Sequence, residues 1–156
     1  MASQTSPLPA SGFFDGTDHL FPVRVYYEDT DLSGVVYHAN YLRYMERARS
    51  DMLRVAGIDQ RAAIEDGLGH YAVADIHIRY QAPARLDDAL LVRSRLTASG
   101  AARCVIHQTV MRDDHIIARA DVTVAFIDAA TGRPRRQPAP WLATFQQILS
   151  EQPSHT

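Results

Sequence analysis

One segment of the chain, residues 26–54, restricts the possible fold more than any other. It reads YYEDTDLSGVVYHANYLRYMERARSDMLR, so an acidic loop with a glycine, Gly34, leads directly into a long amphipathic pattern. In the second half, apolar residues recur at steps of 4, 3, 4 and 3, the repeat of one buried helix face. Those residues are Tyr41, Met45, Ala48, Met52 and Val55. A helix with such a face needs a broad apolar surface to pack against.

The ends of this helix are marked by residues that favour helix termini. Asn40 is a good N-cap residue, and Gly57 suits the left-handed C′ position that follows a helix. Arg47 and Asp51 are four residues apart and are expected to pair on the exposed side. We therefore expect a helix from Asn40 to Gly57, and a short helical turn over residues 59–66.

Downstream of Gly69 the period of the pattern changes from 3.6 to 2, which indicates strands. Four strands are expected, over about residues 70–80, 88–98, 102–112 and 116–127. In the first of them, one side is expected to comprise Ala72, Ala74, Ile76, Ile78 and Tyr80, which alternate with Val73, Asp75, His77 and Arg79. The connections at residues 99–101 and 112–115 are short enough for hairpins, so the last three strands are expected to be antiparallel neighbours. PVRVYY at residues 22–27 predicts one earlier strand, and PAPWLATFQQILS predicts a final amphipathic helix.

The order strand, long helix, four antiparallel strands predicts an α+β fold in which a curved sheet wraps the central helix. Such a sheet leaves edges and apolar surface to cover, so dimerisation is expected. The Ser-, Pro- and Gly-rich residues 1–20 are expected to be a flexible tail, residues 21–150 a single domain and residues 151–156 a C-terminal tail.

Composition excludes several classes of protein. The formal net charge is −2, so no global basic field attracts nucleic acid, and no nucleic-acid partner is expected. The single cysteine, Cys104, fits a reducing compartment. The first residues lack the basic and apolar regions of a signal peptide, and no apolar run is long enough for an integral membrane segment. A cytoplasmic location is expected.

The loop and helix resemble one family of enzymes. YEDTDLSGVVYHANYLRYMERAR, followed by IRYQAPARLDDALLV, is similar to hotdog-fold acyl-CoA thioesterases of the 4-hydroxybenzoyl-CoA thioesterase family, in the YbgC-like, Tol–Pal-associated branch. The resemblance covers about residues 22–138. It implies a hotdog fold, a homodimer or homotetramer, and hydrolysis of an acyl-CoA to free acid and CoA. No cofactor is expected, because coenzyme A is part of the substrate.

The resemblance assigns the catalytic roles. Asp31 stands at the aspartate of the family's DxxG loop and is the expected nucleophile or general base, since an ordinary Asp is ionised at neutral pH. His38 is the second expected catalytic residue. The backbone N–H groups of His38 and Tyr37, at the helix start, are the expected oxyanion donors.

Substrate-binding residues are expected in two places. Asn40 and Tyr41 shape the entry to the helix, and the family's CoA site lies around the turn that contains Ser99, Gly100 and Arg103. The guanidinium of Arg103 suits a phosphate. We expect Tyr44 and Met45 to line the acyl pocket. No metal is expected, because Asp29, Asp31 and His38 lie too close together in the sequence to complete a site.

Alternatives remain for several residues and for the function. Asp29 and Asp31 also suit turns, and Glu46 stands where another hotdog branch has its catalytic carboxylate, although Arg43 and Arg49 favour an ion pair there. An aromatic acyl-CoA thioesterase and a non-catalytic acyl-CoA- or protein-binding module stay possible. A hotdog dehydratase is disfavoured, because the HFPxxPxxPG segment of those enzymes is missing.

Overall fold

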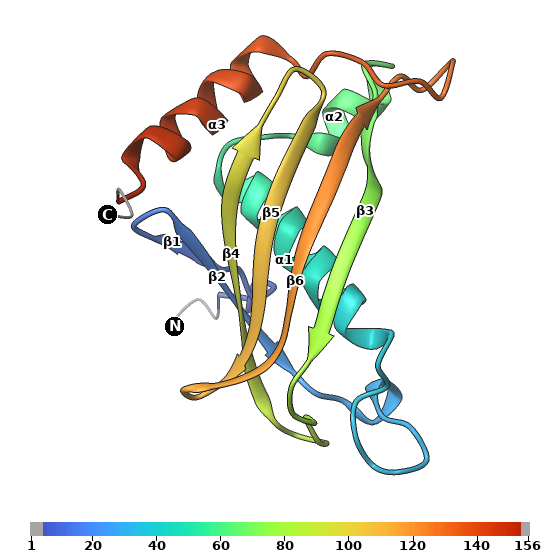
Figure 1. The fold of residues 1–156 in the computed structure, drawn as a ribbon, viewed down its shortest axis with the longest axis vertical. Helices are drawn as coiled ribbons and strands as arrows, with labels where there is room; N and C mark the ends of the chain where they lie inside the picture. Colours follow the sequence, from blue (N-terminus) through green and yellow to red (C-terminus); the bar gives the residue numbers. More distant parts are fainter. Residues whose placement is uncertain (1–4, 154–156) are drawn as a thin grey trace.

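A computed structural model describes residues 5–153 of the 156-residue chain. Its order is strand, strand, helices, four strands, helix (Figure 1). The elements are β1 (Phe13–Asp15), β2 (Asp18–Arg24), η1 (Tyr27–Asp29), α1 (Asn40–Val55), α2 (Gln60–Glu65), β3 (His70–Tyr80), β4 (Ala89–Ser99), β5 (Arg103–Arg112), β6 (His115–Ile127) and α3 (Ala139–Glu151). The four predicted downstream strands and the final helix are confirmed, as is the short helix after Asp59.

All strands form one antiparallel sheet in the order β1-β2-β4-β5-β6-β3. The two predicted hairpins, β4–β5 and β5–β6, are confirmed. Helix α1 lies along one face of this sheet, where it contacts β1, β2, β4 and β5 (Figure 1). The predicted hotdog arrangement is therefore present, and both β1 and β3 are edge strands.

Irregularities in strand pairing bend the sheet around α1, since a β-bulge increases local twist and curvature. They lie between Val73 and Asp75, between Leu96 and Ala98, and between Val110 and Met111. The first corrects the predicted alternation in β3. Ala74, expected on the same side as Ala72 and Ile76, is the residue that the register skips, and it is exposed.

The core lies between α1 and the sheet. Tyr44, Met45 and Ala48 of α1 are fully buried. They face a layer of buried aliphatic side chains on the sheet that includes Val92, Val110, Val122 and Leu96. Burial of each such side chain contributes about 1.5–3 kcal/mol. The predicted apolar face of α1 is thus the buried one, except that Val55 is exposed.

The two ends of α1 differ in how well they were predicted. Gly57 has φ of 88° and follows the helix, as expected for a C′ glycine. The N-cap is Ala39 and makes no side-chain cap, so the assignment of Asn40 as N-cap is wrong. The amide of Asn40 is used elsewhere, because it donates to Asp29.

The expected ion pair of Arg47 with Asp51 is also wrong, because Asp51 is only 2% exposed. Its carboxylate binds the N-terminal segment instead: it accepts from Ser11 Oγ (3.1 Å), Gly12 N–H (2.8 Å) and His19 Nε2 (2.7 Å). A Cβ at Gly12 would meet Leu20 O at 2.0 Å, so only glycine fits. We call this contact between residues 11–19 and Asp51 the N-terminal clasp.

The clasp corrects the expected boundary of the domain. Residues 13–20, part of the expected tail 1–20, form β1, a turn and the first part of β2, and the strand predicted at 22–27 begins at Asp18. The sheet edge gains two strands because apolar Phe14 and Phe21 pack against the core. Residues 1–4 and 154–156 of the expected tails lie outside the described residues.

We expect acid to weaken folding through His19. Burial lowers the pKa of His19, and its Nδ1 has no partner within residues 5–153, so the neutral ring is favoured. The unfolded chain then binds more protons than the folded one below about pH 6.5, the ordinary His value. The stability supplied by the neutral ring is present above that pH and is lost as pH falls through the lowered folded pKa.

Urea unfolding measured between pH 7.5 and 5 checks this expectation. His19→Gln keeps a donor near Asp51 without a titrating ring, so its free energy of unfolding should fall less steeply as the pH is lowered. The matched control is His115→Gln, which changes an exposed histidine. It should leave the dependence of the unfolding free energy on pH as in the wild type. Equal slopes for wild type and His19→Gln would contradict the expectation.

Within the described part of the chain, no helix is both long and apolar enough to cross a membrane.

Candidate functional site

Asp31 lies in an exposed loop, residues 30–36, that is closed at its base by the bridge between Thr30 and Val36. Asp31 N–H donates to Val35 O (2.9 Å), which fixes the backbone of the loop. The carboxylate accepts from the hydroxyl and the N–H of Ser33, both at Oδ1. These hydrogen bonds hold the pKa of Asp31 below its ordinary value. No hydrogen bond to Oδ2 is present among residues 5–153, and because the side chain is exposed and its pKa is lowered, the carboxylate is ionised at neutral pH.

His38 follows this loop, two residues after Val36 and two before the first residue of α1. Its backbone carbonyl accepts from Tyr80 Oη (2.9 Å), and its ring packs against the rings of Tyr37 and Tyr80. The His38 side chain is exposed and makes no hydrogen bond within the described range. Asp31 and His38 therefore share one end of the molecule, but no hydrogen bond joins their side chains.

The two expected oxyanion donors are not equivalent. Tyr37 N–H donates to Asp29 O (2.9 Å), so this donor is already used and the expectation for Tyr37 needs correction. His38 N–H has no acceptor in the described part of the chain. It lies two residues before the first residue of α1, where unpaired N–H groups and the helix dipole favour negative charge.

Asn40 and Tyr41, expected to contact substrate, are buried in this chain. Asn40 Nδ2 donates to Asp29 Oδ1 (2.7 Å), and Tyr41 Oη accepts from Ala84 N–H (3.2 Å). Burial raises the pKa of Tyr41. Asn40 therefore links the start of α1 to η1, and Tyr41 links it to Ala84, in the segment before β4. Both residues are buried, so neither presents its polar atoms freely to solvent.

Ser99, Gly100 and Arg103 lie at the opposite end of the sheet from Asp31. The segment after β2 is bonded to Asp88, just before β4, whereas Ser99 ends β4. The 11 residues of β4 separate the two places by about 30 Å. Figure 1 shows the β4–β5 hairpin and the loop before α1 at opposite ends. A single chain therefore does not bring the two groups of predicted site residues together.

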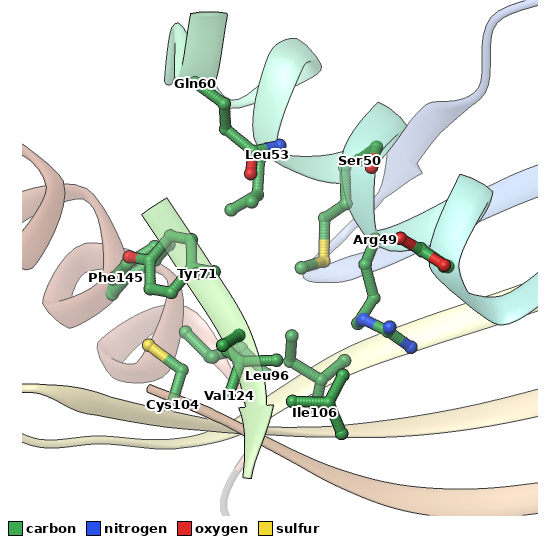
Figure 2. Close-up of a pocket in the computed structure, with 14 residues that line it drawn as sticks. Arg49, Ser50, Leu53, Gln60, Tyr71, Leu96, Cys104, Ile106, Val124 and Phe145 are labelled. Atoms are coloured by element: carbon green, nitrogen blue, oxygen red, sulfur yellow. The ribbon is translucent and has the colours of Figure 1, made fainter. Parts of the chain in front are cut away.

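A cavity of about 290 Å³ lies at the hairpin end, between α1 and the sheet. Figure 2 shows Leu53, Leu96, Ile106, Val124 and Phe145 around it, with Arg49 and Ser50 on the helix side. Tyr44 and Met45, expected at the acyl pocket, are core residues instead and do not line this cavity. Glu46 is exposed at the cavity and forms no ion pair with Arg49 or Arg43 in the described residues.

Sequence reasoning missed three features of these regions. Asp29 is a buried hydrogen-bonding centre, Tyr80 fixes the His38 carbonyl, and Arg49 is a buried guanidinium bound to Gln108 (2.9 Å). Desolvation lowers the pKa of Arg49. Asp29 had a local signal, because it stands three residues after Tyr26, the spacing at which a carboxylate accepts from an N-cap N–H. Tyr80 and Gln108 reach their partners only through the tertiary fold.

Comparison with known proteins identifies the family to which the chain belongs. Residues 25–149 match the family described as the Thioesterase-like superfamily. The chain is 38% identical over 128 residues to the acyl-CoA thioesterase YbgC of Haemophilus influenzae, covering 82% of this chain and 94% of that protein. It is 39% identical over 137 residues to the YbgC acyl-CoA thioesterase of Helicobacter pylori strain J99, covering 81% and 96%.

The fold is also found in a solved relative. The crystal structure of a probable thioesterase from Bartonella henselae has a TM-score of 0.73 and 35% identity, covering 78% of this chain and 99% of that one. The family match spans most of the chain, and both YbgC relatives are covered almost completely. The chain belongs to the thioesterase-like superfamily.

Proposed function

We propose that this chain is an acyl-CoA thioesterase that hydrolyses the thioester to a free acid and CoA at a site built around Asp31. The observation that supports the site is the presence, at one end of the molecule, of an exposed, ionised carboxylate and of a helix-start N–H, that of His38, which has no protein acceptor in residues 5–153. The YbgC relatives, named as acyl-CoA thioesterases, support the reaction. No cofactor is needed for this chemistry.

Each group has a chemical task in the proposal. Asp31 Oδ2 either attacks the thioester carbon to give an anhydride, which water then opens, or takes a proton from the water that attacks. His38 N–H stabilises the oxygen anion that develops on the former carbonyl. The CoA thiolate leaves and takes up a proton, for which the exposed His38 ring is a nearby donor.

The second half of the site comes from another copy of the chain in our proposal. β3 is an edge strand whose outer side has no strand partner among the described residues, and Val73 and Tyr80 on it are exposed. If the β3 strands of two chains pair antiparallel, the Tyr80 end of β3 in one chain, which lies beside His38, meets the His70 end of β3 in the other chain. The cavity and the β4–β5 hairpin with Arg103 lie at the His70 end of each chain. We propose a homodimer, or a homotetramer of two such pairs.

The apolar cavity supports an aliphatic acyl group as substrate. Its wall carries Met52, Leu53, Leu96 and Ile106, and the acyl chain of an acyl-CoA gains from burial against such side chains. An aromatic acyl-CoA is the alternative. The single buried thiol, Cys104, agrees with our proposal of a reducing, cytoplasmic location.

A panel of acyl-CoA esters tests the function. Release of free CoA thiol is followed for short, medium and long aliphatic chains and for one benzoyl ester, and we expect turnover with the highest kcat/KM for an aliphatic member. An enoyl-CoA is added to the panel, and loss of its double bond by addition of water, without thiol release, would indicate a hydratase. Binding of several esters with no turnover would indicate a binding module, and either result would contradict the proposal.

His38→Ala should lower kcat about 10-fold, less than loss of Asp31, because the backbone N–H at position 38 remains while the ring is removed. The measurement is steady-state thiol release across pH 6–9. His115→Ala, which changes an exposed histidine at the first residue of β6, serves as the matched control and should behave as wild type. An unchanged kcat for His38→Ala would show that the imidazole ring of His38 does not take part in the reaction.

A further inference from the structure

The Asp29 carboxylate is buried and holds two elements of the candidate site together. It is 5% exposed and lies at the end of η1. Oδ2 accepts from Tyr26 N–H (2.8 Å), and Oδ1 accepts from Asn40 Nδ2 (2.7 Å). Because Asn40 is the first residue of α1, the carboxylate connects η1 directly to the helix start.

The backbone of Asp29 fixes the same place from a second direction. Its carbonyl accepts from Tyr37 N–H (2.9 Å), and Tyr37 O in turn accepts from Asn40 N–H (2.8 Å). The turn from Tyr37 to Asn40 is therefore held by both the side chain and the main chain of Asp29. Within this turn the His38 carbonyl accepts from Tyr80 Oη, so the orientation of the His38 residue is fixed as well.

This arrangement decides which N–H groups of the turn stay available. Asp29 O accepts from Tyr37 N–H and Tyr37 O accepts from Asn40 N–H, whereas the N–H groups of His38 and Ala39 have no acceptor in the described residues. Of these two, His38 N–H is the proposed oxyanion donor. Asp29 also precedes Asp31 by two residues, at the base of the loop closed by Thr30 and Val36. One buried residue therefore contacts the turn that carries the proposed oxyanion donor and also stands in the segment that leads into the Asp31 loop.

The surroundings of Asp29 favour a structural carboxylate rather than a reacting one. Tyr44 is fully buried beside it, and burial together with the neighbouring Asp29 raises the pKa of the Tyr44 hydroxyl. Both Asp29 oxygens already accept hydrogen bonds from groups of this chain, and such bonds to a carboxylate are stronger than those to a neutral acceptor. Asp29 therefore acts through the groups that it holds.

We propose that Asp29 is a positioning residue for thioester hydrolysis, which sets the orientation of His38 N–H relative to Asp31 through its bonds to Tyr37 and Asn40. This inference rests on the proposed function. Misplacement of a reacting group by about 1 Å is enough to reduce a rate about 100-fold. Asp29 contacts no substrate in this proposal, so its loss should affect kcat more than KM.

An exchange of the two buried side chains tests the proposal. Asp29→Asn leaves one amide NH₂ group facing a donor, either Asn40 Nδ2 or Tyr26 N–H, and Asn40→Asp places two carboxylates together. Each single variant should lower kcat about 10- to 100-fold, with KM changed less than about threefold.

The double variant, Asp29→Asn with Asn40→Asp, restores one donor facing one acceptor between the two positions. The amide oxygen introduced at position 29 still accepts from Tyr26 N–H, while the amide NH₂ donates to the carboxylate introduced at position 40. We expect kcat to recover at least about fivefold over either single variant, because the two changes act on one contact and are not additive.

The controls separate positioning from folding. Circular dichroism at the assay temperature measures the folded fraction, and rates are expressed per folded molecule. Asp114→Asn changes an exposed aspartate in the β5–β6 hairpin and should match the wild type. Wild-type kcat in Asp29→Asn, or a loss that the unfolded fraction fully explains, would overturn the positioning role.

A second readout keeps this inference separate from the proposed function. The amide signal of His38 is followed by ¹⁵N NMR as a non-hydrolysable thioether analogue of an acyl-CoA is added. It should shift in the wild type, and the shift should be reduced in Asp29→Asn and regained in the double variant. A wild type without turnover would contradict the function alone, whereas an equal His38 shift in wild type and Asp29→Asn would contradict the inference.

Discussion

Replacement of Asp31 by Asn should reduce kcat for acyl-CoA hydrolysis by at least about 100-fold while the protein folds normally. The amide has neither the nucleophilic oxygen nor the basicity that the reaction needs, and a positioned general base or nucleophile contributes about 10² to 10⁴ in rate. The side chain is exposed, and Asn can still accept from Ser33 at Oδ1, so the loop should keep its shape. Thiol release and thermal unfolding are measured on the same preparation.

The control for this variant is Asp114→Asn, which removes the same charge from an exposed hairpin and should leave kcat unchanged. Because the Asp31 side chain forms no hydrogen bond with a distant element among residues 5–153, the melting temperature of Asp31→Asn should lie within about 2 °C of wild type. Near-wild-type turnover in Asp31→Asn would remove Asp31 from the mechanism.

The largest effect on stability is expected at the N-terminal clasp. Asp51→Ala removes the acceptor of Ser11 Oγ, Gly12 N–H and His19 Nε2 at a buried position. Loss of one partner of a buried polar group costs about 3–5 kcal/mol where a charge is involved, and each unsatisfied donor contributes to that cost. We expect the unfolding free energy to fall by about 3 kcal/mol and the melting temperature to fall by about 10 °C.

Arg54→Ala is the matched control for the clasp. Arg54 contacts the same carboxylate from the surface (3.5 Å, with a side chain 73% exposed), so its loss should cost less than about 1 kcal/mol. Both variants are compared by urea unfolding at pH 7.5. A loss below about 1 kcal/mol for Asp51→Ala would mean that residues 11–19 contribute little to the folded state.

The elements that depend on local pattern were predictable from the sequence. The spacing of Tyr41, Met45 and Ala48 sets the buried face of α1, and the left-handed Gly57 sets its end. The long strands follow from their alternation. The N-terminal strands were missed because His19 and Asp18 are polar, and they become suitable for burial only when Asp51 and Arg95 supply partners.

The candidate site could be predicted only where its residues are close in sequence. Asp31 and His38 lie in one loop, which brings them to one end of the molecule. Asn40 was assigned as a cap because its type favours that role, but the Asp29 carboxylate competes for its amide. The separation of Ser99 and Arg103 from Asp31 follows from the length of β4. In the proposed dimer the two groups meet across an interface between two chains, and the spacing of residues within one sequence does not indicate which residues meet there.

The most direct test of the central claim is to count both products of one reaction. Wild-type protein is incubated with the acyl-CoA that the panel identifies as best, and free CoA thiol and free carboxylic acid are quantified at the same time points, with Asp31→Asn in parallel. We predict thiol and acid in equal amounts over many turnovers by the wild type and at least about 100-fold slower release by the variant. Absence of turnover by the wild type, or equal rates for the two proteins, would contradict a thioesterase site at Asp31.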